Sequence, residues 1–243
     1  MSGLGVMEKE RGHSFTFKQF VIRDDRCAMK VGTDAVILGA WASIAGAETI
    51  LDIGTGSGIL ALMLAQRTSS NTRIDAVEIA QPDFFQAMEN ARNSPWREKI
   101  NLHHVEIQSY QSNTAYDLIV CNPPYFINSL RPPTLSRERA RHAGSLSSRE
   151  LLAAVKGHLS KAGTFSIILP TAEGIQFQSV AEEFGLYTSR RLAFFSREQK
   201  PQERWLMEFR FEKRAQDTEK LVLYGYGNEW SEEYKLLTRD FYL

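Results

Sequence analysis

The chain has 243 residues, of which 43% are hydrophobic, and its 29 basic side chains balance 29 acidic ones. This length accommodates one domain with added segments, and the balanced charge argues against a general, strongly basic nucleic-acid binder. No apolar span is long enough for a bilayer and the N-terminus lacks the apolar core of a signal peptide, so we expect a cytoplasmic protein without membrane contact. The two cysteines, Cys27 and Cys121, suggest neither a disulfide framework nor a zinc site, and no metal is expected.

The N-terminal residues 1–45 are expected to form a hairpin and a helix that decorate a core domain. Residues 15–22 alternate in part as a strand does, and residues 27–31 could return as its partner strand. Thr33 or Asp34 can cap the helix that follows.

The core domain, residues 46–214, is predicted to be an α/β fold. Its strands are expected at residues 49–53, 73–77, 100–104, 115–121, 163–169, 187–195 and 204–211. Helical patterns alternate with the first five strands, at residues 58–67, 83–93, 147–158 and 175–184. Alternation of this kind predicts a mostly parallel, Rossmann-like sheet with helices on both faces and ligands beyond the carboxyl ends of the strands. The charged residues 212–220 are interpreted as a linker to a C-terminal tail, residues 215–243, that docks on the core.

A glycine loop follows the first buried strand of the core, in the pattern Asp52-x-Gly54-x-Gly56-x-Gly58. Glycines let a ligand touch bare backbone, and Glu78 closes the next strand at the offset where a carboxylate reaches ribose hydroxyls. The spacing differs from the Gly-x-Gly-x-x-Gly dinucleotide pattern, and no Lys-Ser/Thr follows to hold a nucleotide triphosphate. The ribose-bearing cofactor that remains is S-adenosylmethionine.

A second motif, Asn122-Pro123-Pro124-Tyr125, follows the apolar run 117–121. A planar amide or nucleobase amino nitrogen is a poor nucleophile, because its lone pair is delocalised. The Asn122 side-chain oxygen and the Pro123 carbonyl can accept its N–H bonds as positive charge develops, and Tyr125 offers a face for stacking. Taken alone, the tetrapeptide is equally compatible with a strand that ends in a proline turn.

With both motifs, the chain resembles the class I S-adenosylmethionine-dependent methyltransferases, in the amino-methylating branch that carries Asn-Pro-Pro-Tyr. The segments 29–41 and 234–243 are in addition similar to the bacterial valine-tRNA adenine-37 N6-methyltransferases. The resemblance covers almost the whole chain. It implies a seven-stranded sheet of order 3-2-1-4-5-7-6 with the seventh strand antiparallel.

The resemblance also implies residue roles. Lys30, Gly32, Thr33 and Asp34 are expected against the methionine end of the cofactor, and Glu106 near its adenine amino group. Many relatives carry Asp where this chain has Glu106, so that contact is the one the resemblance supports least.

Two basic clusters follow parallel strands and are therefore expected around the same mouth. The candidates for RNA binding are Arg131, Arg137, Arg139, Arg141, Arg149, Arg197 and Lys200. The second cluster also contains Arg190 and Arg191. Each charge run taken alone is also compatible with a solvated surface, but their common edge favours a polyanionic substrate.

The resulting hypothesis is methyl transfer from S-adenosylmethionine to N6 of an adenine in tRNA, implied by the resemblance to be adenine 37 of valine tRNA. An extruded base in an anticodon loop keeps the cost of unstacking low. Two alternatives remain open: a protein glutamine N5-methyltransferase, and a catalytically silent cofactor-binding RNA module. A monomer is expected.

Overall fold

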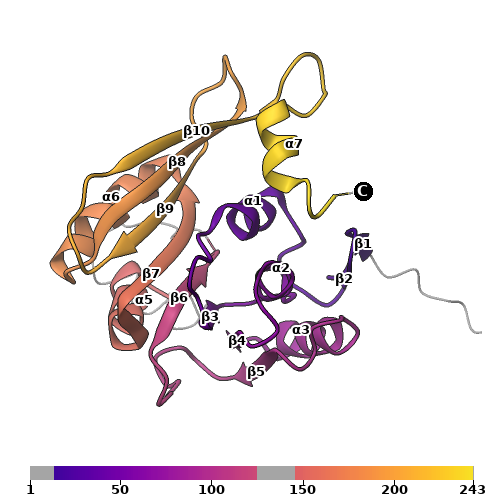
Figure 1. Cartoon of the computed structure of the whole chain (residues 1–243), viewed down its shortest axis with the longest axis vertical. Helices are drawn as coiled ribbons and strands as arrows, with labels where there is room; N and C mark the ends of the chain where they lie inside the picture. The colour runs from indigo at the N-terminus through magenta and orange to yellow at the C-terminus, as the bar shows by residue number, and fades with distance from the viewer. Residues whose placement is uncertain (1–13, 125–145, 243) are drawn as a thin grey trace, which may run out of the picture.

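The computed structural model describes residues 14–124 and 146–242. Its core is an eight-stranded sheet in the order β10-β8-β9-β7-β6-β3-β4-β5 (Figure 1). The strands are β3 (Thr49–Ile53), β4 (Arg73–Glu78), β5 (Ile100–His104), β6 (Tyr116–Cys121), β7 (Leu159–Pro170), β8 (Tyr187–Arg197), β9 (Arg204–Arg210) and β10 (Asp217–Tyr224).

The first seven strands of this sheet follow the predicted order. Numbered from β3 to β9 along the chain, they read 3-2-1-4-5-7-6, and β9 is antiparallel to both of its neighbours, β7 and β8. The other pairings, including β3 with β4 and with β6, are parallel. The predicted α/β class is confirmed, and every parallel strand ends at one edge of the sheet.

Helices cover both faces. The helices α1 (Thr33–Trp41), α2 (Ile59–Arg67) and α3 (Gln81–Arg92) lie on one face, with α5 (Ser148–His158) and α6 (Thr171–Glu183) on the other (Figure 1). Alternation along the strands separates two cores, because Ile50, Leu118 and Val120 pack toward α1 and α2 whereas Leu51 and Ile119 pack toward α5 and α6. Within the described residues, no helix has the length and apolar character needed to span a membrane.

The N-terminal hairpin differs from the prediction. Its strands are β1 (Ser14–Thr16) and β2 (Val21–Arg23), so residues 15–22 supply both strands, and the prediction that residues 27–31 form the partner was wrong. The turn is short because Phe17 N donates to Phe20 O at 2.9 Å. Helix α1 is capped by Gly32 without a side-chain hydrogen bond, so neither Thr33 nor Asp34 caps it.

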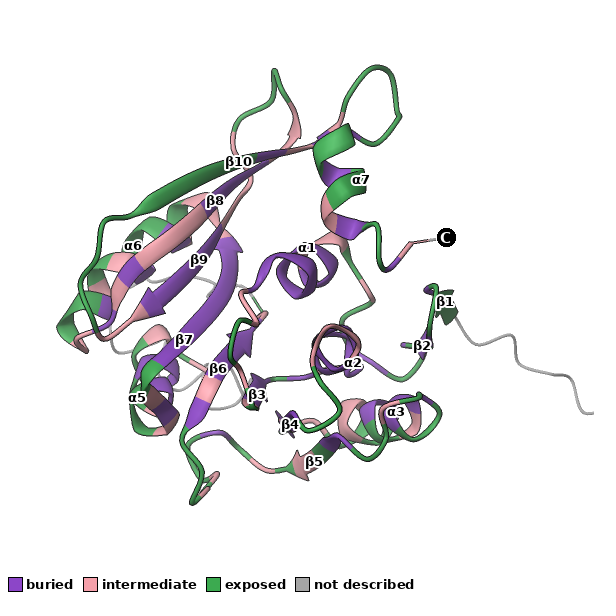
Figure 2. Cartoon of the chain, viewed as in Figure 1, coloured by how far each residue is buried: buried purple, intermediate pink, exposed green. Residues whose placement is uncertain are grey.

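The C-terminal segment contains a strand that was not predicted. Residues 217–224 form β10, which pairs in parallel with β8, so the prediction that residues 212–220 form a linker is wrong. Figure 2 shows the first part of β10 exposed, and this part comprises residues 217–220. Such exposure is expected of an edge strand that carries charged side chains. Helix α7 (Glu232–Thr238) follows and packs near α1. The division of the chain at residues 45/46 and 214/215 stays a prediction.

Candidate active site at the carboxyl edge of the sheet

The predicted cofactor and catalytic motifs meet at the carboxyl edge of the sheet. The glycine loop leaves β3, Glu78 ends β4, and Asn122 follows β6, and these three strands are neighbours in the order β6-β3-β4. Adjacent strands lie about 4.8 Å apart, so roughly 10 Å separates the ends of β4 and β6.

The glycine loop has the conformation that its sequence requires. Gly54, Gly56 and Gly58 have φ of 71°, 56° and 86°, a left-handed region that side chains other than glycine rarely adopt. A Cβ built on Gly54 or Gly56 would meet no atom within 4 Å, whereas one on Gly58 would lie 3.4 Å from Ala87. The loop therefore leaves open space above its first two glycines, and its third glycine permits close packing on α3.

Glu78 organises this loop from the next strand. Its side chain is buried, with Oε2 accepting from Gly56 N at 2.9 Å and Oε1 accepting from Ala80 N at 2.8 Å. The carboxylate thus joins the glycine loop to the start of α3. The predicted contact with ribose hydroxyls stays a prediction, but the carboxylate lies directly beside the open cradle.

Asp52 is fully buried at the base of the loop. Its Oδ2 accepts from Thr55 Oγ1 at 2.6 Å, and its Oδ1 has no hydrogen-bond partner among the residues that the structure describes. Burial raises the pKa of Asp52 to about 7, against the opposing effect of the Thr55 hydrogen bond. Burial also raises the pKa of the neighbouring Cys121 thiol well above its ordinary value, with the charges of Asp52 and Glu78 adding to the effect.

The residues expected near the methionine end of the cofactor lie in the segment that leads into α1. Lys30 Nζ donates to Asp24 O at 2.6 Å and closes the preceding turn. Asp34, in the first turn of α1, forms an ion pair with Arg204 of β9 at 2.8 Å. Gly32 is exposed and Thr33 half-buried. The Lys30 and Asp34 charges are therefore used within the protein.

Three polar side chains of α3, missed in the sequence, fix this segment. Asp83 Oδ1 accepts from Ala28 N, Gln86 Oε1 from Arg26 N, and Asn90 Oδ1 from Arg23 N, at 3.2, 3.4 and 3.0 Å. Asn90 Nδ2 also donates to Ser57 O in the glycine loop at 2.8 Å. The spacing 83, 86 and 90 places these side chains on one helical face, and this was the available signal.

The catalytic motif is described in part. Asn122 is half-buried, Pro123 is buried and Pro124 is exposed, directly beyond β6. Tyr125 lies outside the described residues, so its predicted stacking role has no structural account here.

The predicted adenine contact lies one strand further along the edge. Glu106 is exposed, and its backbone carbonyl accepts from Ser109 N at 2.9 Å and Tyr110 N at 3.0 Å. Ile79, which follows Glu78, was not singled out in the sequence, although its large apolar side chain is 48% exposed. An apolar side chain at this place suits the flat face of a ligand ring.

The basic candidates are placed unevenly. Arg131, Arg137, Arg139 and Arg141 lie outside the described residues. Arg149 pairs with Glu183 of α6. Arg197, at the end of β8, donates to Gly227 O and, at 2.6 Å, to Asn228 Oδ1, so it braces the turn after β10. Lys200 is exposed in the turn that follows β8.

Arg190 and Arg191 are not at the mouth. Arg190 lies over the Trp41 ring at 4.0 Å, and Arg191 lies over the Trp205 ring at 4.6 Å. Counting them with a basic cluster at the active-site edge was wrong, because they stand in the first half of β8, whereas only its carboxyl end reaches that edge.

Comparison with known proteins identifies the family. The family model for the methyltransferase small domain matches residues 32–189. A tRNA1(Val) (adenine(37)-N6)-methyltransferase of Bacteroides thetaiotaomicron is 45% identical over 94% of this chain and 97% of its own length. One of Tolumonas auensis is 44% identical over 96% of this chain and 98% of its own.

Solved structures share the fold at much lower identity. A predicted O-methyltransferase of Agrobacterium tumefaciens matches with a TM-score of 0.66 at 14% identity, over 86% of this chain and 96% of its own. A type I restriction-modification methyltransferase subunit of Streptococcus thermophilus matches at 0.60 and 18% identity, over 88% of this chain and 53% of its own. These two likenesses establish the class I methyltransferase fold alone.

Proposed function

The chain belongs to the family of tRNA1(Val) (adenine(37)-N6)-methyltransferases, and on that premise we propose that it transfers a methyl group from S-adenosylmethionine to N6 of adenine 37 in valine tRNA. The relatives cover nearly the full chain, so the proposal extends to substrate as well as reaction.

The glycine loop and its carboxylates fit the cofactor. The open space above Gly54 and Gly56 accommodates a ligand against bare backbone, and Glu78 stands beside it to accept from ribose hydroxyls. Gly32, Thr33 and Asp34 are proposed for its methionine end, with Lys30 and the α3 side chains holding that segment. When bound, S-adenosylmethionine supplies an electrophilic methyl group on its sulfonium.

Asn122 and Pro123 are proposed to act on the adenine amino group. The side-chain oxygen of Asn122 and the Pro123 carbonyl accept its two N–H bonds, which favours tetrahedral geometry at N6 as it attacks. The fixed φ of Pro123 and Pro124 holds these acceptors stiffly. No covalent enzyme intermediate is needed, and the rate derives from positioning and electrostatics.

The proposed partner is the tRNA substrate, bound through its phosphates by basic side chains. Arg131, Arg137, Arg139, Arg141, Arg149, Arg197 and Lys200 remain the proposed phosphate contacts. We propose a monomer that acts in the cytoplasm and needs no metal.

The observation that carries the proposal is the placement of Asn122 one strand from the glycine cradle, in a chain 45% identical to a named tRNA adenine methyltransferase. The test is transfer of labelled methyl groups from S-adenosylmethionine into tRNA from cells that lack this gene, followed by nucleoside analysis. Label in N6-methyladenosine, lost from a valine tRNA transcript with adenine 37 replaced, supports the proposal.

The same experiment separates the alternatives. Label in a protein fraction, insensitive to ribonuclease, would instead indicate the glutamine N5-methyltransferase. Absence of label with retained RNA binding would indicate the silent module. The 45% identity over 94% of the chain favours the tRNA enzyme over both.

A further inference from the structure

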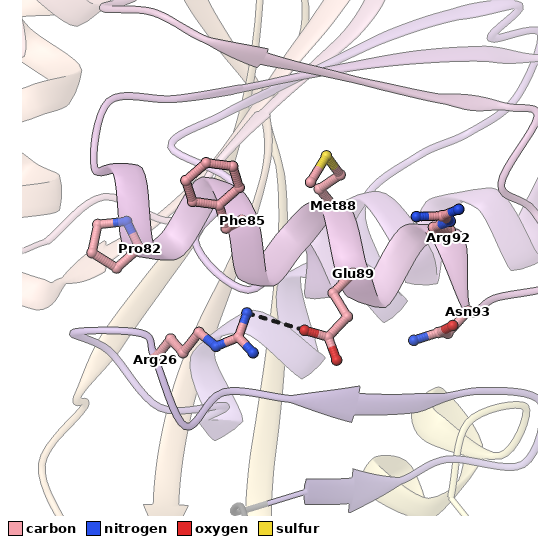
Figure 3. Close-up of a pocket in the computed structure, with 7 residues that line it drawn as sticks. All are labelled: Arg26, Pro82, Phe85, Met88, Glu89, Arg92 and Asn93. Carbon is pink, nitrogen blue, oxygen red and sulfur yellow. Dashed lines mark ion pairs between the residues drawn. The ribbon is translucent and has the colours of Figure 1, made fainter.

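Helix α3 has a second face that the cofactor site does not use. Its inner face contacts the glycine loop through Ala87 and Asn90. On its outer side, Phe85 and Met88 are each 43% exposed, which is unusual for such large apolar side chains. Figure 3 shows both projecting from the same side of the helix.

These side chains border a groove of about 490 Å³. Its lining consists of Arg26, Pro82, Phe85, Met88, Glu89, Arg92 and Asn93, which we call the α3 surface. Arg26, in the N-terminal segment, pairs with Glu89 at 3.1 Å (Figure 3). Arg23, outside this lining, reaches the same carboxylate at 3.4 Å. The lining thus contains two arginines, Arg26 and Arg92, and one carboxylate, Glu89, beside an exposed aromatic ring.

The α3 surface lies close to the active-site edge. Helix α3 starts just after β4, and the exposed Ile79 stands between that strand and the helix. A helix with its side chains is about 10 to 12 Å across, so the outer face of α3 is about that far from the glycine loop. A tRNA that presents an adenine to Asn122 can therefore reach both places at once.

We propose that the α3 surface binds the substrate RNA outside the methylated nucleotide, with Phe85 stacking on an unpaired base and Arg26 and Arg92 contacting phosphates. The inference rests on the proposed function. An aromatic face with flanking arginines is the combination that binds single-stranded nucleic acid, because every base has a face to stack and every nucleotide a phosphate.

A second copy of the chain fits this surface less well. A stable interface buries about 800 Å² on each partner, with 20 to 30 residues a side, whereas seven residues line this groove. Self-association would also bring the arginines of two copies together. Charge and size both favour RNA.

The test measures affinity for a valine tRNA transcript and its dependence on salt in Phe85→Ala, Phe85→Trp and Arg92→Gln. Phe85→Ala should weaken tRNA binding by roughly 5- to 150-fold, and Phe85→Trp should retain it. Arg92→Gln should lower the log–log salt slope by about 0.7 to 0.9. Lys161→Gln is the matched control, because it removes the same charge near the start of β7, away from the active-site edge. It should change neither the tRNA affinity nor the salt slope.

Cofactor affinity and thermal unfolding should stay at wild-type values in all four variants, since none of these side chains touches the cradle. Wild-type tRNA affinity and salt slope in both Phe85→Ala and Arg92→Gln would overturn the inference. So would a wild-type dimer that Phe85→Ala dissociates, because the surface would then serve self-association. A wild-type protein that binds tRNA through this surface without methylating it would refute the proposed function and leave the inference standing.

Discussion

The buried carboxylates Glu78 and Glu208 lie in two different regions of this molecule, and their partners differ. In the glycine-loop region, Glu78 is 6% exposed and accepts from the backbone amides of Gly56 and Ala80. In the region between α1 and β9, Glu208 is 3% exposed, accepts from Ser43 N at 2.8 Å and faces Arg190 Nε at 3.4 Å.

In the second region, a further hydrogen bond and an ion pair extend from Arg190 to the neighbouring elements. Arg190 also donates to Trp41 O at 2.6 Å, and Trp41 Nε1 donates to Glu219 of β10 at 3.2 Å. This network joins α1, β8, β9 and β10, whereas the glycine loop leaves open space. The difference is that the Glu78 carboxylate is bound by backbone amides beside open space, where we propose that the cofactor lies, whereas the Glu208 carboxylate is paired with an arginine inside a network of side chains.

The largest effect is expected from a substitution that lowers the methylation rate and leaves both regions intact. Asn122→Ala should reduce the methylation rate by about 100- to 1000-fold, the usual loss when a group that stabilises developing charge is removed. Cofactor binding and thermal unfolding should stay unchanged, since the cradle and the Arg190 network are intact. Single-turnover methylation beside calorimetric cofactor titration checks this, and an active variant would contradict the assignment.

Titration of Asp52 sharpens the comparison. Because its pKa is raised from 3.8 to about 7, the folded state holds a proton that the unfolded chain releases, and stability should fall as pH rises from about 4 to about 7. Asp52→Asn removes this dependence. As pH rises through this range, the free energy of unfolding of the variant should increase relative to that of the wild type, by up to about 4 kcal/mol. Parallel pH profiles of the two proteins would refute the assignment.

Removal of the cation tests the enclosed region. Arg190→Ala leaves Glu208 buried without its ionic partner, which should cost about 3 kcal/mol of folding stability. Denaturant unfolding measures the loss. Cofactor affinity of the folded variant should match wild type, and a selective loss of cofactor binding would break the division between the two regions.

The smallest effect is expected at the cradle. Gly56→Ala places a side chain at φ 56°, which should cost about 1 to 2 kcal/mol of stability, and its Cβ occupies ligand space. Cofactor affinity should fall in Gly56→Ala, because the added Cβ would enter the space proposed for the cofactor, whereas backbone strain alone should leave it unchanged. Gly227→Ala, at φ 63° in the turn after β10, is the matched control for backbone strain. Equal cofactor affinity in the two variants would argue against the cradle.

Most strands of the sheet could be predicted because they are short apolar runs whose successive side chains pack against helices on opposite faces. Strand β10 was missed because its first four residues are exposed on an edge, and only Leu221 and Leu223 are buried. Helix α1 lacks an amphipathic pattern for the opposite reason, because residues 35–41 are all buried and no polar face alternates with the apolar one.

Within the site, the sequence predicted the local motifs but not the contacts between distant positions. The glycine loop and Glu78 are fixed by neighbouring strands, so sequence spacing was informative. The contacts of Asn90 with Arg23 and Ser57 join positions 67 and 33 residues away, which no local pattern encodes. Arg197 and Arg190 show that a cluster of arginines in sequence divides among separate partners in space.

The N-terminal hairpin is completed by the last described residues of the chain. Lys18 N donates to Phe241 O at 2.8 Å, Lys18 Nζ donates to Arg239 O at 2.6 Å, and Phe17 packs on Tyr242 with ring centroids 5.8 Å apart. Lys18 and Arg239 are 221 positions apart. At about 5 to 20 residues per second of synthesis, the hairpin emerges roughly 10 to 40 seconds before its partner exists. The hairpin therefore gains its C-terminal contacts only when translation has passed residue 242, well after α3 has been made and can hold residues 23–28.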